Sequence, residues 1–288
     1  MICNICPRKC SAKRTAEENI GGFCKAPQNP KIARADLHFW EEPPISGTRG
    51  SGTVFFSGCS LSCVYCQNYN VSRSLSGKTV SVKELANLFY ELEQKGAHNI
   101  NLVTPDHYVY AIKEALRIYR PSIPIVFNSG GYVLKEQLKV LEDYIDIYLL
   151  DYKYIDKQKA KKYSGAEDYP EVVKKAVDFA VKAQPECVFD QNGIMQKGVI
   201  VRHLLLPLST NDAIKIFDSV TSEHKNIYFS LMGQYIPVGK AEEFPEINRK
   251  ITKREYEKVV NHILISGFEN CFFQELSSAD KKFIPDFN

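Results

Sequence analysis

The sequence predicts an α/β protein: a partial barrel of six strand–helix units, (β/α)6, preceded by a small cysteine-rich segment. After about residue 50, short apolar runs alternate with amphipathic patterns in regular order, as expected for a parallel sheet. Before that point the chain is rich in Cys, Pro and Gly, and seven of the nine cysteines lie within the first 66 residues. We therefore expect a metal-binding segment with its linker over residues 1–50 and the barrel over residues 51–288.

Six apolar runs are the strand candidates, and their β-branched and aromatic content is typical of strands buried on both faces. They cover residues 52–58, 99–104, 123–128, 145–152, 198–206 and 226–232. Helical patterns follow at 81–95, 107–119, 134–143, 170–183, 210–222 and 252–265. At the first helix, Ser81 followed by Glu84 predicts a capping box. A right-handed series of such units curls into a barrel whose chemistry gathers at the carboxyl ends of its strands.

Composition narrows the class of protein. The length of 288 residues and the 44% hydrophobic content suit one large domain with a substantial core. The net charge of +3 does not favour nucleic-acid binding. No apolar run reaches 18 residues, and the N-terminus lacks the pattern of a signal peptide. We expect a cytoplasmic protein, not bound to a membrane, whose cysteines bind metal and do not form disulfides.

The most informative motif is a C-x3-C-x2-C run formed by Cys59, Cys63 and Cys66, directly after the first strand candidate. Three thiolates so close together can hold three irons of a [4Fe-4S] cluster, which normally takes four thiolates. The fourth iron then keeps an open position, as catalytic metal centres do. A zinc site that borrows a histidine is the alternative. The run resembles the signature of the radical S-adenosylmethionine (SAM) enzymes, in which SAM completes the fourth iron.

A second cysteine set lies at the N-terminus. Cys3, Cys6, Cys10 and Cys24 give the spacing C-x2-C-x3-C-x13-C and a complete set of four thiolates. Such a set suits a tetrahedral zinc, which would fold a segment too short to bury its own core. It equally suits a second [4Fe-4S] cluster that relays electrons. The sequence slightly favours zinc, because a short segment without its own core needs a bound metal or a disulfide to be stable.

Polar side chains stand near the ends of the later strand candidates, where a barrel would bind its ligand. They are Thr104, Asn128, Ser129, Asp151, Lys153, Arg202 and Gln234. SAM carries a carboxylate, an ammonium and a ribose diol, each of which needs a fixed partner. Arg or Lys suits the carboxylate, whereas Asn, Ser or Asp suits the hydroxyls and the ammonium. Asp151 and Lys153 share one strand face and equally suit a simple ion pair, but their place at a strand end favours a ligand role.

Seven stretches together carry a closer resemblance, namely residues 3–10, 40–47, 59–68, 101–105, 151–153, 201–204 and 232–235. Through them, nearly the whole chain resembles the radical SAM proteins related to pyruvate formate-lyase activating enzyme. The resemblance implies reductive cleavage of SAM to methionine and a 5′-deoxyadenosyl radical, which abstracts a hydrogen atom from the substrate. It places Tyr65 near the adenine and the Asp151–Lys153 pair beside the methionyl end of SAM. Arg202 matches an arginine on the fifth strand.

One departure from that family concerns the segment after the second strand. The activating enzymes carry Gly-Gly-Glu there to bind the SAM ammonium, whereas this chain has Val103-Thr104-Pro105-Asp106. The backbone carbonyls, or Asp106, would then have to accept the ammonium. The four N-terminal cysteines are also absent from the simplest activating enzymes.

The resulting expectation is a radical SAM enzyme that takes electrons from a donor such as flavodoxin or ferredoxin. Its substrate is not specified by the sequence. A protein or peptide is one substrate class, and the glycine of a glycyl-radical enzyme is one target. The alternative from another class is a non-catalytic iron–sulfur electron-transfer protein, which the lack of a fourth nearby cysteine disfavours.

Overall fold

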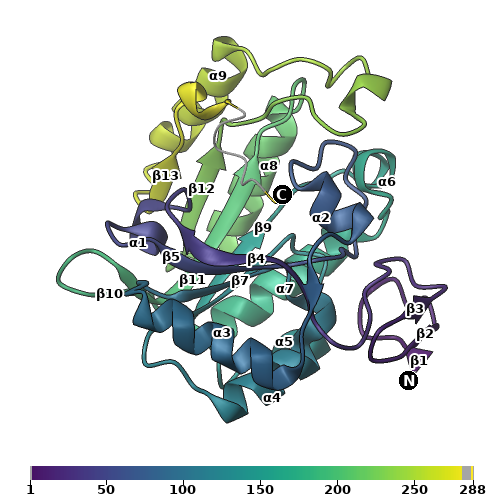
Figure 1. Cartoon of the computed structure of the whole chain (residues 1–288). Coiled ribbons are helices and arrows are strands. Elements are labelled where there is room, and N and C mark those ends of the chain that lie inside the picture. The colour runs from purple at the N-terminus through teal and green to yellow at the C-terminus, as the bar shows by residue number, and fades with distance from the viewer. Residues whose placement is uncertain (1, 281–286, 288) are drawn as a thin grey trace.

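Two sheets organise the chain in a computed structural model that describes residues 2–280 and 287. The small sheet has the order β1-β2-β3 and contains β1 (Ile2–Cys3), β2 (Ala12–Arg14) and β3 (Asn19–Ile20). The large sheet has ten strands in the order β13-β12-β11-β9-β8-β7-β5-β4-β6, with β10 paired to β11. Figure 1 shows the small sheet at the lower right, beside the main body of the molecule.

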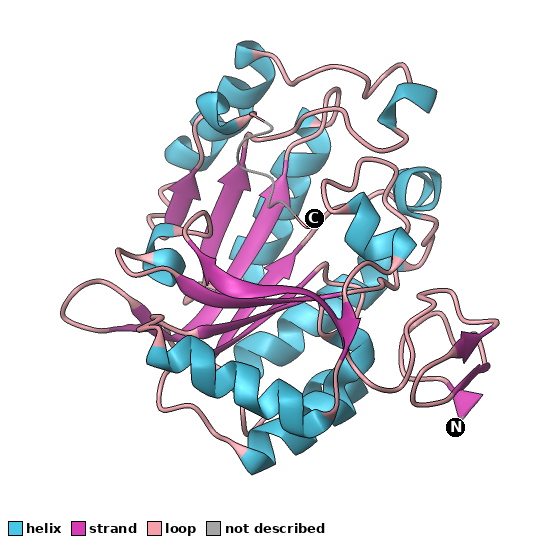
Figure 2. Ribbon diagram, in the orientation of Figure 1, coloured by secondary structure: helices cyan, strands magenta, loops and turns pink. Residues whose placement is uncertain are grey.

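The large sheet is mostly parallel. Its strands are β4 (Lys31–His38), β5 (Ser51–Phe56), β6 (Lys78–Thr79), β7 (Ile100–Val103), β8 (Ile125–Ser129), β9 (Ile147–Asp151), β10 (Val188–Phe189), β11 (Met195–Leu204), β12 (Tyr228–Met232) and β13 (Cys271–Phe273). From β5 to β13 the neighbouring strands on the main path pair in parallel, whereas β4 runs antiparallel to β5 and to β6. All six strand predictions are confirmed, and so is the parallel α/β fold. Figure 2 shows the strands turning from nearly horizontal at β5 to upright at β12; closure into a partial barrel stays an interpretation of that twist.

Helices connect the parallel strands. They are α1 (Pro43–Ser46), α2 (Tyr69–Ser74), α3 (Val82–Gln94), α4 (Val109–Ile118), α5 (Lys135–Leu141), α6 (Lys157–Ser164), α7 (Tyr169–Ala183), α8 (Thr210–Glu223) and α9 (Lys253–Ile265), with 3₁₀ turns η1 (Asp106–Tyr108), η2 (Ala241–Glu243) and η3 (Leu276–Ser278). All six helix predictions are confirmed within a few residues. The capping box is also confirmed: Ser81 Oγ accepts from the Glu84 N–H at 3.2 Å, and the Ser81 N–H donates to Glu84 Oε2 at 2.8 Å.

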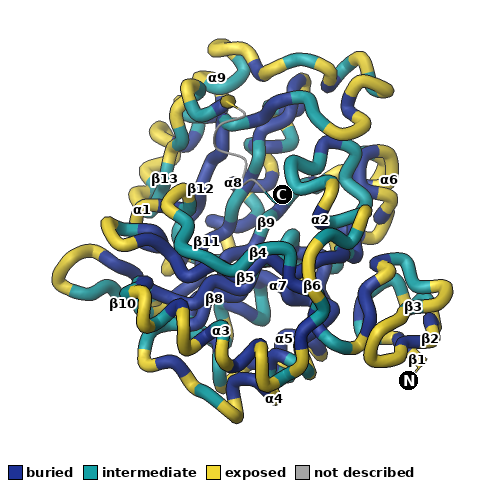
Figure 3. Tube along the Cα trace, in the orientation of Figure 1, coloured by how far each residue is buried: buried dark blue, intermediate teal, exposed yellow. Residues whose placement is uncertain are grey.

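The two faces of the sheet pack against different partners because alternate strand residues point to opposite sides. One face, which includes Phe127, Leu150 and Val201, packs against the long helices in the main core. The other face packs Val126, Ile147, Leu149 and Ile200 against Met195 and against Ile45 of α1. Figure 3 shows the buried strands enclosed by helices whose outer surfaces are exposed. The second face carries the polar residues described below.

The predicted linker contains a strand of the large sheet. β4 pairs with β5 from Ile32↔Phe56 to His38↔Ser51, so its last residue lies beside the first residue of β5. The chain then crosses the N-terminal edge of the parallel strands and enters α1. Residues 31–46 therefore belong with the large sheet, and the boundary predicted at residue 50 does not coincide with the change from one sheet to the other. None of the described helices has the length and apolar character needed to cross a membrane.

Candidate metal centre

The C-x3-C-x2-C motif forms the loop between β5 and α2. A hydrogen-bonding group lies beside each of its sulfurs. The Leu61 N–H donates to Cys59 Sγ at 3.4 Å. Ser164 Oγ lies 2.9 Å from Cys63 Sγ, and Ser72 Oγ lies 3.4 Å from Cys66 Sγ. Hydrogen bonds to cysteine sulfurs are one means by which a protein tunes an iron–sulfur cluster.

The cysteine side chains of this loop are half-buried and lie close to one another. Burial raises the pKa of the Cys59 and Cys66 thiols, and the nearby Cys63 raises both further. Without a metal these sulfurs would therefore carry protons at neutral pH. A metal ion displaces such protons and binds the thiolates. The donor set, three cysteines without a fourth in the same loop, fits a [4Fe-4S] cluster with one open iron.

A buried group of charges stands on the same sheet face. Arg202 Nε donates to Asp151 Oδ1 at 2.8 Å, its Nη2 donates to Asn128 Oδ1 at 2.7 Å, and its Nη1 donates to Glu41 Oε2 at 2.9 Å. The Arg202 side chain is only 13% exposed. Each of the three guanidinium nitrogens of Arg202 has a protein acceptor, so this side chain holds Asp151, Asn128 and Glu41 together. The structure thus brings the predicted residues Asn128, Asp151 and Arg202 together.

Lys153 joins this group through Asp151. Its Nζ lies 2.6 Å from Asp151 Oδ2, so the ion pair considered from the sequence is present. Burial opposes ionisation of Asp151, but Arg202 and Lys153 outweigh it and lower the pKa of that carboxyl. Burial likewise opposes the charge on Lys153, but Asp151 and the sulfur of Cys63 raise its pKa. Lys153 is therefore a fixed cation close to the cysteine loop, with further N–H donors beyond the one used by Asp151.

Two glutamates that the sequence analysis did not name as site residues complete the group. Glu41 Oε1 accepts from the side-chain amides of Asn101 and Asn128, each at 3.1 Å. Glu42 Oε2 lies 3.8 Å from Arg202 Nη1 and accepts no hydrogen bond within the described part of the chain. Burial raises the pKa of Glu42, and Arg202 only partly offsets it. The one sequence signal for them was their place in the 40–47 stretch.

Asp106 and Ser129 form a second polar pair near the cysteine loop. Ser129 Oγ donates to Asp106 Oδ1 at 2.5 Å. Burial raises the pKa of Asp106 to about 6, although the Ser129 hydroxyl works against the shift. Thr104 just before this turn has a φ of +58° and donates its N–H to the Asn128 carbonyl at 2.8 Å. A positive φ is strained for a β-branched residue and is found mostly where the surrounding structure enforces it.

The last two predicted SAM contacts lie in different surroundings. Tyr65 is buried, and its hydroxyl lies 2.5 Å from that of Tyr154, which in turn lies 2.8 Å from Ser164 Oγ. Tyr65 is therefore linked through two hydroxyls to the atom that contacts Cys63. Gln234, just after β12, accepts a hydrogen bond at its Oε1 from Gln274 at 2.8 Å, beside the end of β13.

The N-terminal cysteines also come together. Cys3, Cys6 and Cys24 are buried and Cys10 is half-buried. Burial raises the pKa of Cys6 to about 11, and the charges of Cys24, Cys3 and Cys10 add to that shift. Two side chains donate to the sulfurs: Arg14 Nη1 lies 3.7 Å from Cys3 Sγ, and Asn19 Nδ2 lies 3.8 Å from Cys24 Sγ. The small sheet and its loops thus place the four cysteines of this predicted metal site in one part of the fold.

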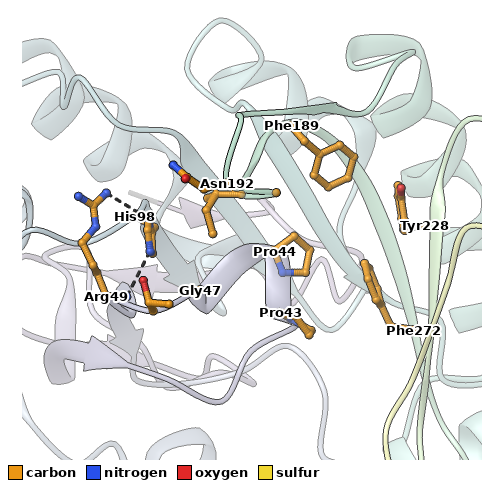
Figure 4. Close-up of a pocket in the computed structure, with 12 residues that line it drawn as sticks. Pro43, Pro44, Gly47, Arg49, His98, Phe189, Asn192, Tyr228 and Phe272 are labelled. Atoms are coloured by element: carbon orange, nitrogen blue, oxygen red, sulfur yellow. Dashed lines mark hydrogen bonds between the residues drawn. The ribbon is translucent and has the colours of Figure 1, made fainter.

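A cavity of about 620 Å³ lies at the opposite, N-terminal edge of the parallel strands. Its wall includes α1, the β10–β11 hairpin and the stacked rings of Tyr228 and Phe272, whose centroids are 5.0 Å apart. Figure 4 shows Arg49 and His98 on one side of it and Phe189 on the other. None of the predicted site residues lines this cavity, so it is separate from the cysteine loop.

The chain is similar to one protein family and to two other known proteins that we report here. Residues 53–195 match the family model of the radical SAM superfamily. An uncharacterized protein of Methanocaldococcus jannaschii is 29% identical over 268 residues, which cover 90% of this chain and 73% of that protein. A crystal structure of methylornithine synthase aligns with 72% of this chain at 14% identity and a TM-score of 0.48. That alignment spans 59% of the length of the synthase chain.

The charged group generates a stability prediction. Arg202→Met keeps the length of the side chain but leaves Glu41, Glu42 and Asp151 without their shared cation. Breaking a buried ion pair by removing one partner costs about 3–5 kcal/mol, and we expect a loss of that size in urea unfolding at pH 8. The same change at Arg117, which pairs with Glu114 at the surface, should cost less than about 1 kcal/mol.

The pH dependence of that loss is a further check. In the native protein the lowered pKa of Asp151 contributes stability above its unfolded pKa, and this is lost as the pH falls. In Arg202→Met the stranded carboxylates have raised pKa values, so the variant gains stability as they take up protons. The difference between the two proteins should therefore shrink from pH 8 to pH 5. A constant difference would contradict the assignment of Arg202 as their counter-ion.

Proposed function

We propose that SAM is reductively cleaved beside the Cys59–Cys66 loop and that the resulting radical abstracts hydrogen from a substrate. Residues 53–195 match the radical SAM superfamily, and the protein is a radical SAM enzyme. The observation that carries the proposal is the loop of three cysteines after β5, faced by the fixed cation Lys153. We therefore do not adopt the alternative of a non-catalytic iron–sulfur electron carrier. A radical SAM domain implies both a [4Fe-4S] cluster and SAM as cofactors.

In this proposal Cys59, Cys63 and Cys66 hold the cluster. When bound, it supplies the electron that cleaves SAM to methionine and a 5′-deoxyadenosyl radical. The protein side chains bind and orient: thiolates fix three irons and leave one position open. Ser164 and Ser72 place hydroxyls against two of the sulfurs. The Tyr65 hydroxyl contacts the Tyr154 hydroxyl, which contacts Ser164 Oγ and so helps to fix the position of that serine.

The SAM contacts follow from which donors and acceptors are still available. Lys153 keeps N–H donors for the SAM carboxylate, whereas Arg202 holds Asp151 and so fixes Lys153. Asp106, held by Ser129, offers an acceptor for the SAM ammonium in place of the glutamate of the activating enzymes. Thr104, two residues before Asp106, has a positive φ of 58°. Asn128, Tyr65 and Gln234 stay predicted contacts of the ribose and adenine end.

The second part of the proposal concerns the class of substrate from which hydrogen is abstracted. The Asp151–Lys153 pair and Arg202 match the activating enzymes, which supports a glycine of a partner enzyme as the hydrogen donor. Asp106 in place of Gly-Gly-Glu departs from that group, so a peptide or a small molecule is the second substrate class. An electron donor such as flavodoxin or ferredoxin is the partner that either reaction requires.

The first prediction concerns the cluster loop. Anaerobically reconstituted, dithionite-reduced protein should form 5′-deoxyadenosine from SAM, and Cys63→Ala should lower the rate at least a hundredfold because the cluster loses a ligand. Cys271→Ala changes a cysteine outside both sets and should leave the rate within about twofold. Product is measured by liquid chromatography. Turnover by Cys63→Ala at the native rate would contradict the assignment of Cys63 as a cluster ligand.

The second prediction concerns Asp106. Hydrogen bonds to charged groups are worth about 1.5–3 kcal/mol, so Asp106→Asn should weaken SAM binding by roughly 10- to 100-fold at pH 8. Because the pKa of Asp106 is raised to about 6, native affinity should fall as the pH drops through 6, and the variant should lack this dependence. Equilibrium dialysis with labelled SAM measures both. Equal affinities at pH 8 would rule out Asp106 as the ammonium acceptor.

A further inference from the structure

We infer that Cys3, Cys6, Cys10 and Cys24 bind a second [4Fe-4S] cluster, seated against the loop of the first and serving as its electron entry point. The inference deepens the proposed function, on which its electron-transfer part rests. Three features of the described residues carry it: the spacing of the four sulfurs, the docking of the small sheet and the route that Arg8 makes between the two cysteine sets.

The distances between the sulfurs help to choose between a zinc ion and a [4Fe-4S] cluster, the two alternatives that the sequence left open. A zinc ion with zinc–sulfur bonds of about 2.3 Å holds the sulfurs of its tetrahedron about 3.8 Å apart. Within residues 2–280, no three cysteine sulfurs lie within 4.8 Å of one another. In a cube each thiolate binds a different iron, so the sulfurs stand farther apart than around one ion. The loop of Cys59, Cys63 and Cys66 shares this wide spacing, and the four-cysteine set therefore resembles it more than a zinc tetrahedron.

The small sheet is docked on the cluster loop. A Cβ added to Gly58, the residue before Cys59, would lie 2.8 Å from the Cys24 carbonyl oxygen. Gly58 has a φ of +89°, which also favours glycine. On the other side, Arg14 Nη1 donates to the His107 carbonyl at 3.0 Å, just after Asp106. The backbones of the two cysteine segments therefore come as close as van der Waals contact allows.

Arg8 makes a direct connection between the two metal sites. It lies between Cys6 and Cys10 in the sequence, and its Nε donates to the Ser60 carbonyl, next to Cys59, at 2.7 Å. Its Nη2 donates to the Ser164 carbonyl at 3.2 Å, and its Nη1 donates to the Gly165 carbonyl. Ser164 is the residue whose hydroxyl contacts Cys63. A metal that only stapled a short segment would not need this contact with the first loop.

One electron is transferred in each cleavage of SAM. A reduced iron–sulfur or flavin protein gives one electron to the second cluster and is itself oxidised by one electron. The second cluster passes that electron to the first, which consumes it in the cleavage of SAM. The chain supplies the short path, from the Cys6–Cys10 loop through Arg8 to the Ser60 peptide and Cys59.

Metal content tests the site without reference to activity. Anaerobically purified native protein should contain about eight irons and no zinc. The triple variant Cys59→Ala/Cys63→Ala/Cys66→Ala should keep about four irons, with the Mössbauer signature of a [4Fe-4S] cluster. Cys6→Ala/Cys24→Ala should also keep about four, in a cluster whose electron paramagnetic resonance signal changes when SAM is added. Cys187→Ala/Cys271→Ala is the matched control and should keep all of them.

Zinc at one ion per chain with about four irons in the native protein would overturn the inference, even if the N-terminal variants fail to fold. An iron-free triple variant that retains native circular dichroism would do the same. Both outcomes are metal contents, which are measured without any SAM cleavage, so they do not depend on the proposed function. Conversely, native protein that holds both clusters but forms no 5′-deoxyadenosine would count against the proposed function alone.

The electron route has its own measurement. Cys6→Ala/Cys24→Ala should acquire the signal of the reduced first cluster at the native rate with dithionite, but at least tenfold more slowly with reduced flavodoxin. The small reductant can reach the first cluster directly, whereas the protein donor depends on the entry point. Equal rates with flavodoxin would remove the second cluster from the route.

Discussion

The guanidinium of Arg202 is the contact on which the arrangement of the site depends. It joins Asp151 at the end of β9, Asn128 at the end of β8 and Glu41 from the segment after β4. Through Asp151 it also fixes Lys153, which faces the cysteine loop. One side chain thus holds three separate parts of the sheet in register with each other. A cation in this position is needed because the carboxylates around it are almost fully buried, and burial without a partner would neutralise or expel them.

This constraint also explains the segment that closes the N-terminal edge of the sheet. Glu41 and Glu42 can reach Arg202 only because the chain leaves β4 beside the start of β5 and turns at once into α1. Ile45 of α1 then fills the apolar layer below the charges. The same sheet face is therefore apolar near its N-terminal edge and charged toward its carboxyl edge. The cysteine loop follows the carboxyl end of β5, and the cavity in Figure 4 lies at the other edge.

Much of this could be predicted from local sequence. The apolar runs of the parallel strands, the capping box at Ser81 and the cysteine spacing are all patterns of neighbouring residues. The strand-end rule also predicted that Asp151 and Lys153 lie at the carboxyl edge of the sheet, and the structure brings both close to Arg202. β4 was missed because its residues, Lys31 to His38, mix charged and apolar types and are mostly half-buried.

The glutamates were missed for a different reason. Glu41 and Arg202 are 161 residues apart in the sequence, and nothing local marks them as partners. The sequence also could not show that Arg202 donates to Asp151, Asn128 and Glu41, which come together only in the tertiary structure. Asp106 was recognised only as the occupant of a motif position; its burial and its bond to Ser129 come from the tertiary structure.

The central claim is that three thiolates leave one iron open for SAM. Electron–nuclear double resonance on the reduced protein with SAM labelled by ¹⁵N at its amino group and ¹⁷O at its carboxylate tests it directly. We expect hyperfine coupling from both labels, because both groups would bind the open iron. A loaded four-iron cluster that shows neither coupling with saturating SAM would contradict it.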